Sequence, residues 1–235
     1  NLFSNIGDNS TNYKNGFTNE TEYFNRNSTS DFLNEVGDRK SERNSNYFNG
    51  GIEYFFNDKT SIVASFVNNK RDGSTNTINS ISQDFNQIKS FSERIENEDE
   101  IDDTNEFSLN FSKEFKREGH KITLDYQKEN SKEIESSFIS NKQINPELIT
   151  YPSEKIVTKE SQNSELFKLD YVLPFENNAI FEAGFRINNQ NQNIDYLVEE
   201  ENNNGEYSSN QNLSNTLLYN EKVNAFYTQY GNKKN

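Results

Sequence analysis

The sequence contains no cysteine, no methionine and no tryptophan, and it has a single histidine, His120. The lack of cysteine excludes disulfide bridges, thiol nucleophiles and cysteine-ligated metal sites. One histidine excludes a metal site built from several histidines and argues against a histidine-based catalytic triad. No glycine-rich phosphate loop, Gly-x-Ser-x-Gly turn or metal-ligand spacing occurs either. We therefore expect no enzymatic activity, no cofactor and no bound metal.

Positive charge is also scarce, because 24 Lys and Arg stand against 38 Asp and Glu, a net charge of −14. Nucleic-acid binding needs a cationic surface, so we do not expect it here. No run of about 18 apolar residues occurs, which excludes a transmembrane helix. The first residues, Asn1-Leu2-Phe3, lack the basic and apolar stretches of a signal peptide. Since methionine is absent, we expect residues 1–235 to be one internal segment of a longer protein.

Only 30% of the residues are apolar, against a usual ~45–50%. Such a composition permits disorder, but the 19 Phe and 12 Tyr lie in short segments where apolar and polar residues alternate. Alternation with a period of two predicts β-strands with one apolar face. The predicted strands are Leu2–Asp8, Tyr47–Phe56, Ile62–Val67, Glu106–Phe115, Lys121–Gln127, Phe167–Leu173, Ala179–Ile187 and Lys222–Tyr230.

Short connections rich in turn-forming residues join these strands in pairs, which predicts hairpins. The connections lie at residues 57–61, 117–119 and 174–178. Opposed residues of an antiparallel pair have a constant index sum, and their side chains share a face. The patterns predict Tyr54 opposite Ala64 in the first hairpin, and Tyr171 opposite Phe181 in the third.

Long polar segments separate the hairpins, at Asn69–Asn105, Asn130–Ser161 and Asn188–Leu218. Loops of this length are uncommon in compact domains. Here they recur on the same side of the hairpins. Short turns on one side and long loops on the other are typical of a transmembrane β-barrel. The sequence therefore predicts an antiparallel transmembrane β-barrel, with the long loops as the place for ligand contacts.

The alternation also assigns side chains to the two faces of the barrel wall. We expect polar residues facing the lumen at Glu53, Asp125, Lys168, Asp170, Glu182 and Arg186. We expect lipid-facing residues at Ile52, Tyr54, Phe56, Phe107, Leu109, Phe111, Leu124, Tyr126, Phe167, Leu169, Tyr171, Phe181 and Phe185.

Four features of the sequence are candidate sites of catalysis or metal binding. Asp170 and Glu182, predicted to oppose each other, could act as an acid–base pair, but lumen residues balanced by nearby cations are favoured. The acidic run Glu93–Asp103 could bind Ca²⁺ weakly, but it lacks EF-hand spacing and is interpreted as a solvated loop. Glu199–Gly205 is interpreted as a loop tip with a turn at its Asn-Gly pair. His120 is interpreted as an exposed turn residue.

Three stretches resemble the barrel region of TonB-dependent receptors of the Bacteroidetes, within the outer membrane protein beta-barrel family. They are Tyr47–Ser61, then Ser164–Pro174 with Ala183–Arg186, and Tyr219–Tyr227. The resemblance implies a barrel of about 22 strands in a Gram-negative outer membrane, of which this chain supplies about eight. It also implies five partners: membrane lipid, the rest of the barrel, a plug domain, TonB acting through that plug, and an imported, scarce ligand.

Two other readings stay open at this point. A closed eight-stranded structural barrel would need no further strands. A secreted β-sandwich or adhesin-like binding module would bury the aromatic stripes in a core, and would show hairpin loops of mixed length. A soluble enzyme ranks last, because no catalytic residues support it.

Overall fold

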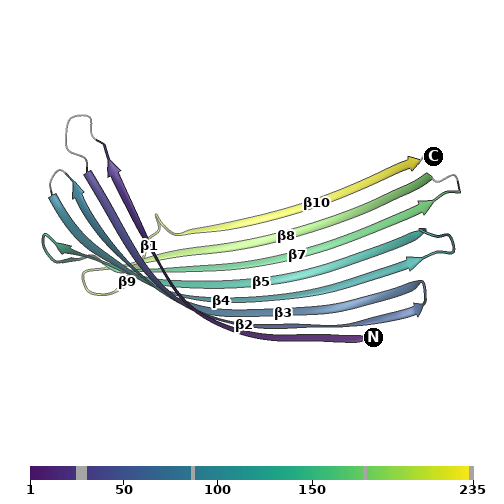
Figure 1. Ribbon diagram of the computed structural model, residues 1–235, viewed down its shortest axis with the longest axis horizontal. Helices are drawn as coiled ribbons and strands as arrows, with labels where there is room; N and C mark the ends of the chain where they lie inside the picture. Colours follow the sequence, from purple (N-terminus) through teal and green to yellow (C-terminus); the bar gives the residue numbers. More distant parts are fainter. Residues whose placement is uncertain (25–30, 86–87, 177–178, 233–235) are drawn as a thin grey trace.

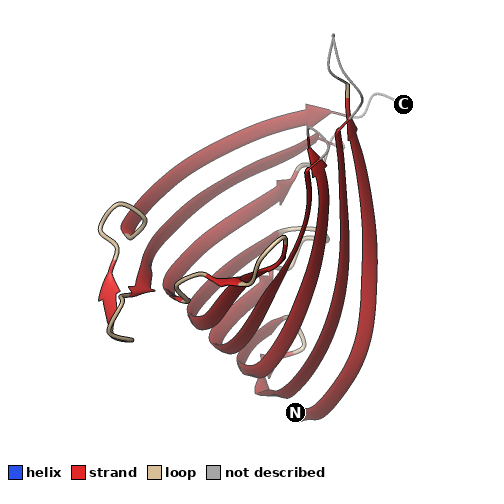
Figure 2. Ribbon diagram, turned by 90° about the vertical axis from the view of Figure 1, so that its left-hand side faces the viewer, coloured by secondary structure: helices blue, strands red, loops and turns tan. Residues whose placement is uncertain are grey.

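The computed structural model describes residues 1–24, 31–85, 88–176 and 179–232, and it shows one curved β-sheet (Figures 1 and 2). The strands are β1 (Leu2–Tyr23), β2 (Asp31–Asn57), β3 (Thr60–Phe85), β4 (Ile88–Glu114), β5 (Lys121–Asn145), β6 (Ile149–Thr150), β7 (Glu154–Pro174), β8 (Ala179–Glu201), β9 (Tyr207–Ser209) and β10 (Asn215–Asn232). The sheet has the order β1-β2-β3-β4-β5-β7-β8-β10, with β6 on β5 and β9 on β8. All pairs are antiparallel, which confirms the predicted fold class.

The two ends of the sheet differ. At one end, short turns join β2 to β3, β4 to β5 and β7 to β8, and β1 begins and β10 ends there (Figure 1). Asn57 Oδ1 accepts a hydrogen bond from Lys59 N at 3.0 Å in the first turn. Gly119 has a φ of 74° in the second, a conformation that glycine adopts without steric cost. In the third turn, the predicted turn residues Asn177 and Asn178 lie outside the described part.

The segments predicted as long loops are mostly strand, and that prediction was wrong. Within Asn69–Asn105, β3 and β4 pair continuously from Asn69 opposite Thr104 to Phe85 opposite Ile88. Only residues 146–153 and 202–214 of the other two segments hold substantial non-strand connections. Backbone hydrogen bonds do not depend on side-chain polarity, so a ladder begun between apolar segments continues between polar ones. Cross-strand amide pairs add to it, such as Asn76 Nδ2 donating to Asn97 Oδ1 at 2.8 Å.

The hairpin registers differ from the prediction by two residues, while the faces are kept. Tyr54 lies opposite Ile62 and Tyr171 opposite Ala183. A slip of two residues leaves every side chain on its face, so the alternation cannot distinguish these registers. A bulge between Phe55 and Asn57 sets the offset of the first hairpin and leaves Phe56 out of the ladder.

The sheet is a single layer with very little core. In the described residues, the buried hydrophobic side chains are only Ile139, Ala179 and Val198, while Ile52, Phe107 and many other large apolar residues are exposed. No helix long and apolar enough to cross a membrane occurs in the described part of the chain. A sandwich needs a second layer on its apolar face, and these strands supply none.

Candidate functional site

The strand ladders place the two predicted residue sets on opposite faces of the sheet. One face can be followed across six strands through opposed residues. The opposed pairs are Ile52–Ala64, Ala64–Leu109, Leu109–Tyr126, Tyr126–Phe167 and Phe167–Ile187. We call this face the band face, and the opposite one the polar face. The predicted lipid-facing residues of the ladders lie on the band face, and Glu53, Asp125, Lys168, Asp170, Glu182 and Arg186 lie on the polar face. Contact of these faces with lipid and with water stays a prediction.

Isolated apolar residues such as Ile101 and Ile134, which are opposed, lie on the band face farther from the short turns, but closely spaced apolar residues occupy the part near those turns. They span Phe48–Tyr54, Ile62–Phe66, Phe107–Phe111, Ile122–Tyr126, Phe167–Leu173 and Ala179–Ile187. We call this region the apolar band and the strand segments beyond it the extension. Ring pairs flank the band, as in the aromatic girdles of membrane barrels. Phe48–Phe66 and Phe107–Tyr126 lie toward the extension, and Tyr54–Phe56 and Phe175–Tyr230 toward the short turns.

A polar node crosses three strands on the polar face within the band. Tyr227 of β10 lies opposite Gly184 of β8, and its hydroxyl donates a hydrogen bond of 2.7 Å to Asp170 Oδ1 on β7. The other Asp170 oxygen pairs with Lys168 Nζ at 2.6 Å. Because Gly184 has no side chain, the tyrosine ring can pass over it to reach Asp170.

The predicted opposition of Asp170 and Glu182 is wrong. Asp170 lies opposite Gly184, and Glu182 lies opposite Val172, because the hairpin register is shifted by two residues. Asp170 is held by Lys168 and Tyr227 instead. Asp170 is thus one of the paired charges of a polar wall, and it does not form an acid–base pair with Glu182.

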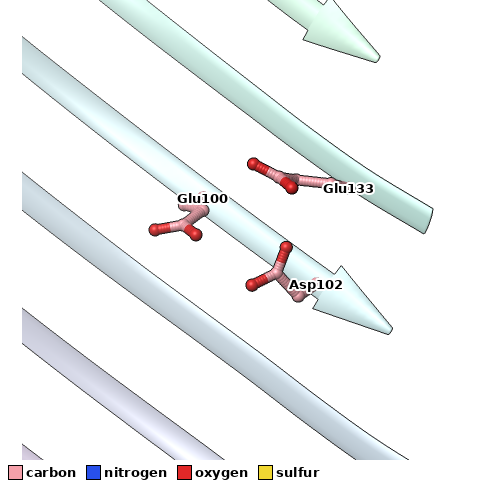
Figure 3. Close-up of side chains that lie close together, drawn as sticks. All are labelled: Glu100, Asp102 and Glu133. Carbon is pink, nitrogen blue, oxygen red and sulfur yellow. The ribbon is translucent and has the colours of Figure 1, made fainter. Parts of the chain in front are cut away.

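A carboxylate cluster lies on the polar face of the extension (Figure 3). Glu100 and Asp102 of β4 and Glu133 of β5 bring carboxylate oxygens within 4.8 Å of one another. Arg71 of β3 pairs with Glu100 at 2.5 Å and also with Asp102, and Arg43 of β2 pairs with Glu100 at 3.6 Å. The donors would suit a hard cation such as Ca²⁺, but the guanidinium of Arg71 already neutralises part of their charge.

The run Glu93–Asp103 is therefore divided between the two faces of β4. Glu100 and Asp102 point to the polar face, while Asp99 and Asp103 lie on the band face of the extension. The polar face is the more enclosed, since Glu96, Glu98, Glu100 and Asp102 are half-buried while residues 97, 99 and 101 are exposed. Crowding on one face is what the concave side of a curved sheet produces.

Burial changes the acidity of this cluster, which lies outside the band. It raises the pKa of Asp102 even though Arg71 acts in the opposite direction. Burial and the charge of Asp102 raise the pKa of Glu133. Burial and the charge of Glu135 raise the pKa of Glu98. Like charges held close in a half-buried site favour the protonated carboxyl.

These shifts predict a pH dependence of the extension. A raised carboxyl pKa gives stability that is complete below the unfolded value, near 4.5 for Glu133, and lost as the pH rises through the folded value. We expect the urea midpoint of the extension, followed by circular dichroism, to fall as the pH rises above 4.5. Glu133→Gln should reduce the fall. Glu129→Gln, on the same strand and face but outside the cluster, should leave it unchanged, and equal behaviour of both variants would contradict the prediction.

His120 and the second acidic segment take definite positions. His120 is half-buried rather than exposed: its ring stacks on Phe115 at 4.1 Å, and Nε2 lies 3.0 Å from the Tyr171 hydroxyl. It thus joins the aromatic rings at the short-turn end of the band. Glu199–Glu201 belong to β8, and the predicted turn follows them, with Gly205 at a φ of 80°. Hydrogen bonds from the Ser153 side chain and backbone lower the pKa of Glu201.

Arginine positions were missed by sequence reasoning. Arg39, Arg43, Arg71 and Arg94 lie on the polar face of the strands, as the predicted lumen-facing residue Arg186 does. Arg94 pairs with Glu96 at 3.5 Å on this face. The alternation of faces along each strand would place these arginines, but Arg71 and Arg94 lie in the predicted loop Asn69–Asn105, and residues 9–46 are not among the predicted strands.

A one-layer antiparallel sheet, with an apolar girdled band on one face and paired charges on the other, defines the wall of an outer-membrane β-barrel. The profile described as the outer membrane protein beta-barrel family matches residues 113–235. The chain belongs to this family, as the resemblance predicted, and its place is the outer membrane, which is a lipid environment. The alternative of a secreted soluble sandwich is therefore wrong.

Comparison with solved structures gives a weaker likeness. The ferric yersiniabactin uptake receptor FyuA from Yersinia pestis is 11% identical, with a TM-score of 0.27. The match covers 96% of this chain and 42% of the receptor chain. The chain thus spans less than half the length of that receptor. A search of the curated proteins found no match.

Proposed function

We propose that the chain forms part of the barrel wall of a transporter of the TonB-dependent receptor type, which takes up a scarce ligand. In such a protein a plug domain closes the barrel, and TonB supplies energy through the plug. The chain's contribution would be wall, lumen lining and the surface that first meets the ligand. Barrels of about 22 strands with a plugged lumen are known among outer-membrane transporters.

The length of the strands carries this proposal. β4 has 27 residues, whereas a strand crosses a bilayer in about 9–11. The extension therefore stands well outside the membrane, and its polar face continues that of the band without a break. A barrel with a purely structural role in the membrane does not need strands that extend so far beyond the bilayer. A receptor can capture a dilute solute on it and lead the solute down to the lumen.

Both edges of the sheet support a wider barrel. In the described residues no ladder joins β1 to β10, and every residue of β10 is exposed. Phe226 on the band face of β10 is 73% exposed. Unpaired backbone groups are costly in a bilayer and invite pairing with another strand. Further strands of the barrel would satisfy both edges.

Shortening one hairpin tests the proposal. In the intact protein, an Asn-Gly turn would replace residues 70–103, so that Asn69 and Thr104, which are opposed, close the hairpin. We expect normal arrival in the outer membrane, because the apolar band is kept. Under nutrient limitation, we expect the same growth defect as loss of the whole protein.

The matched control replaces only residues 83–90 by the same turn and keeps Ser82 opposite Phe91. It should grow normally, because the carboxylate cluster and most of the wall remain. Normal growth of the variant lacking residues 70–103 would overturn the receptor proposal. Failure of that variant to reach the outer membrane would overturn the assignment of the band as the membrane-spanning part.

A further inference from the structure

A cavity of about 330 Å³ opens on the extension, between β1, β2, β3 and β4. Its lining includes Asn15, Phe17, Arg39, Thr77, Glu96 and Glu98. All of these lie on the polar face, since Asn15, Arg39, Thr77 and Glu96 are opposed in one row across the four strands. Pockets for small ligands begin at about this size.

The charges of the cavity are separated by one strand. Arg39 lies on β2, Glu96 and Glu98 lie on β4, and Thr77 of β3 lies between Arg39 and Glu96. Neighbouring strands are ~4.8 Å apart, so the backbones that carry the two signs stand about 10 Å apart. A solute above Thr77 would meet a guanidinium on one side and carboxylates on the other.

A hydrogen-bonded pair lies beside the cavity, and one wall of the cavity is aromatic. Ser41 and Thr75, both buried, share a hydrogen bond of 2.8 Å next to the row of Arg39 and Thr77. Phe17 lies opposite Gly37, and its ring occupies the space that a side chain at Gly37 would need. Phe17 still keeps 48% of its surface exposed. The ring thus offers a fixed apolar face to a ligand.

We propose that this cavity binds a small zwitterion of the amino-acid or short-peptide type. The ligand carboxylate would accept hydrogen bonds from Arg39, its ammonium would face Glu98, and its apolar part would lie on Phe17. Glu96 is already paired with Arg94 at 3.5 Å. Guanidinium–carboxylate pairs are strong and directional. A purely cationic ligand would meet Arg39, and a purely anionic one would meet Glu98, so each is disfavoured by like charge. The inference rests on the proposed function, because it names the solute class that the wall captures.

The test uses the intact protein from outer membranes and three forms of one dipeptide. Glycyl-phenylalanine carries both charges, its N-acetyl form only the carboxylate, and its amide only the ammonium. Calorimetry should show that the zwitterion binds at least about tenfold more tightly than either capped form, the effect expected from one charged hydrogen bond.

Two variants assign the charges. Arg39→Gln should weaken glycyl-phenylalanine about tenfold, again the loss of one charged hydrogen bond, and should not weaken the amide, which meets Arg39 only as a like charge. Glu98→Gln should weaken glycyl-phenylalanine and should not weaken the N-acetyl form, which meets Glu98 only as a like charge. The controls are Lys40→Gln and Asp99→Asn, neighbours that point to the opposite face, and they should bind like the unchanged protein.

Equal binding of the three forms, or no difference between Arg39→Gln and Lys40→Gln, would overturn the inference. Absence of binding by protein that is inserted in the outer membrane would overturn it too, while leaving the receptor proposal standing. The receptor proposal fails separately, through normal growth of the shortened hairpin variant. A variant that does not reach the outer membrane is recognised by fractionation, and the other charge variant then decides.

Discussion

Replacing Leu124 by arginine is expected to give the largest loss of stability of any single change in the band. Leu124 lies midway along the apolar band, opposite Phe111 on β4 and Leu169 on β7. A charged side chain on the lipid face at the bilayer midplane costs about 2–4 kcal/mol. The free energy of unfolding from lipid vesicles should fall by about this amount, and less protein should reach the outer membrane.

The matched control is Thr123→Arg, one residue earlier on β5 and therefore on the polar face. Thr123 lies opposite Asp170, in a wall that already holds Lys168 and Arg186. We expect this arginine to change stability little, because the polar face meets water and carboxylates. Equal losses for Leu124→Arg and Thr123→Arg would show that the two faces do not differ in environment.

Adding a methyl group at Gly184 is expected to displace the edge strand β10. A Cβ there would lie 2.6 Å from Tyr227 Cζ and 2.7 Å from Asp170 Oδ1, closer than unbonded atoms approach. The ring must move, so its hydrogen bond to Asp170 is lost. Overpacking of this kind costs about 1–3 kcal/mol, and we expect urea unfolding in lipid to show a loss of that size for Gly184→Ala.

Two further variants make this prediction specific. Gly231→Ala, also near the short-turn end, meets open space and should be neutral. Gly184→Ala combined with Tyr227→Ala should be more stable than the sum of the two single losses, because the clash needs both side chains. Additive losses of stability would show that the effect of Gly184→Ala does not come from a clash with the Tyr227 ring.

The fold class and the two faces could be predicted because the band has strong contrast between neighbours. In Phe167–Leu173, for example, apolar and polar residues alternate at nearly every position. A β-strand places alternate residues on opposite faces, so it separates the apolar side chains from the polar ones. The offset of each hairpin could not be predicted, because a shift of two residues keeps that separation. In the first hairpin the bulge near Phe56 sets the offset, and a bulge leaves no clear signal in side-chain polarity.

The extension was misread because it lacks this contrast. Outside the bilayer both faces of a strand can meet water, so Asn188–Asn193 contains only asparagine and glutamine. Such a run has the composition of a loop even though β8 pairs through it with β7 and β10. The strand conformation comes from the ladder, which begins in the band and brings each polar residue opposite a partner.

The candidate sites could not be predicted for the same reason. Glu100 and Glu133 come together only through the register of β4 and β5, within segments read as loops. The node at Tyr227 gave a partial signal, since a lone glycine inside a strand often marks a close approach. Gly184 fits that rule, but in Lys222–Tyr230 the apolar and polar residues do not alternate cleanly, so the pattern does not show which face carries Tyr227.

Cysteine labelling tests the central claim, that the band face meets lipid and the polar face meets water. Because the chain has no cysteine, each cysteine placed at residues 166–173 of β7 is the only one in this segment. In outer membranes, a water-soluble maleimide should label positions 166, 168, 170 and 172, while positions 167, 169, 171 and 173 should react only with a lipid-soluble maleimide. Labelling of both sets by the water-soluble reagent would contradict the claim.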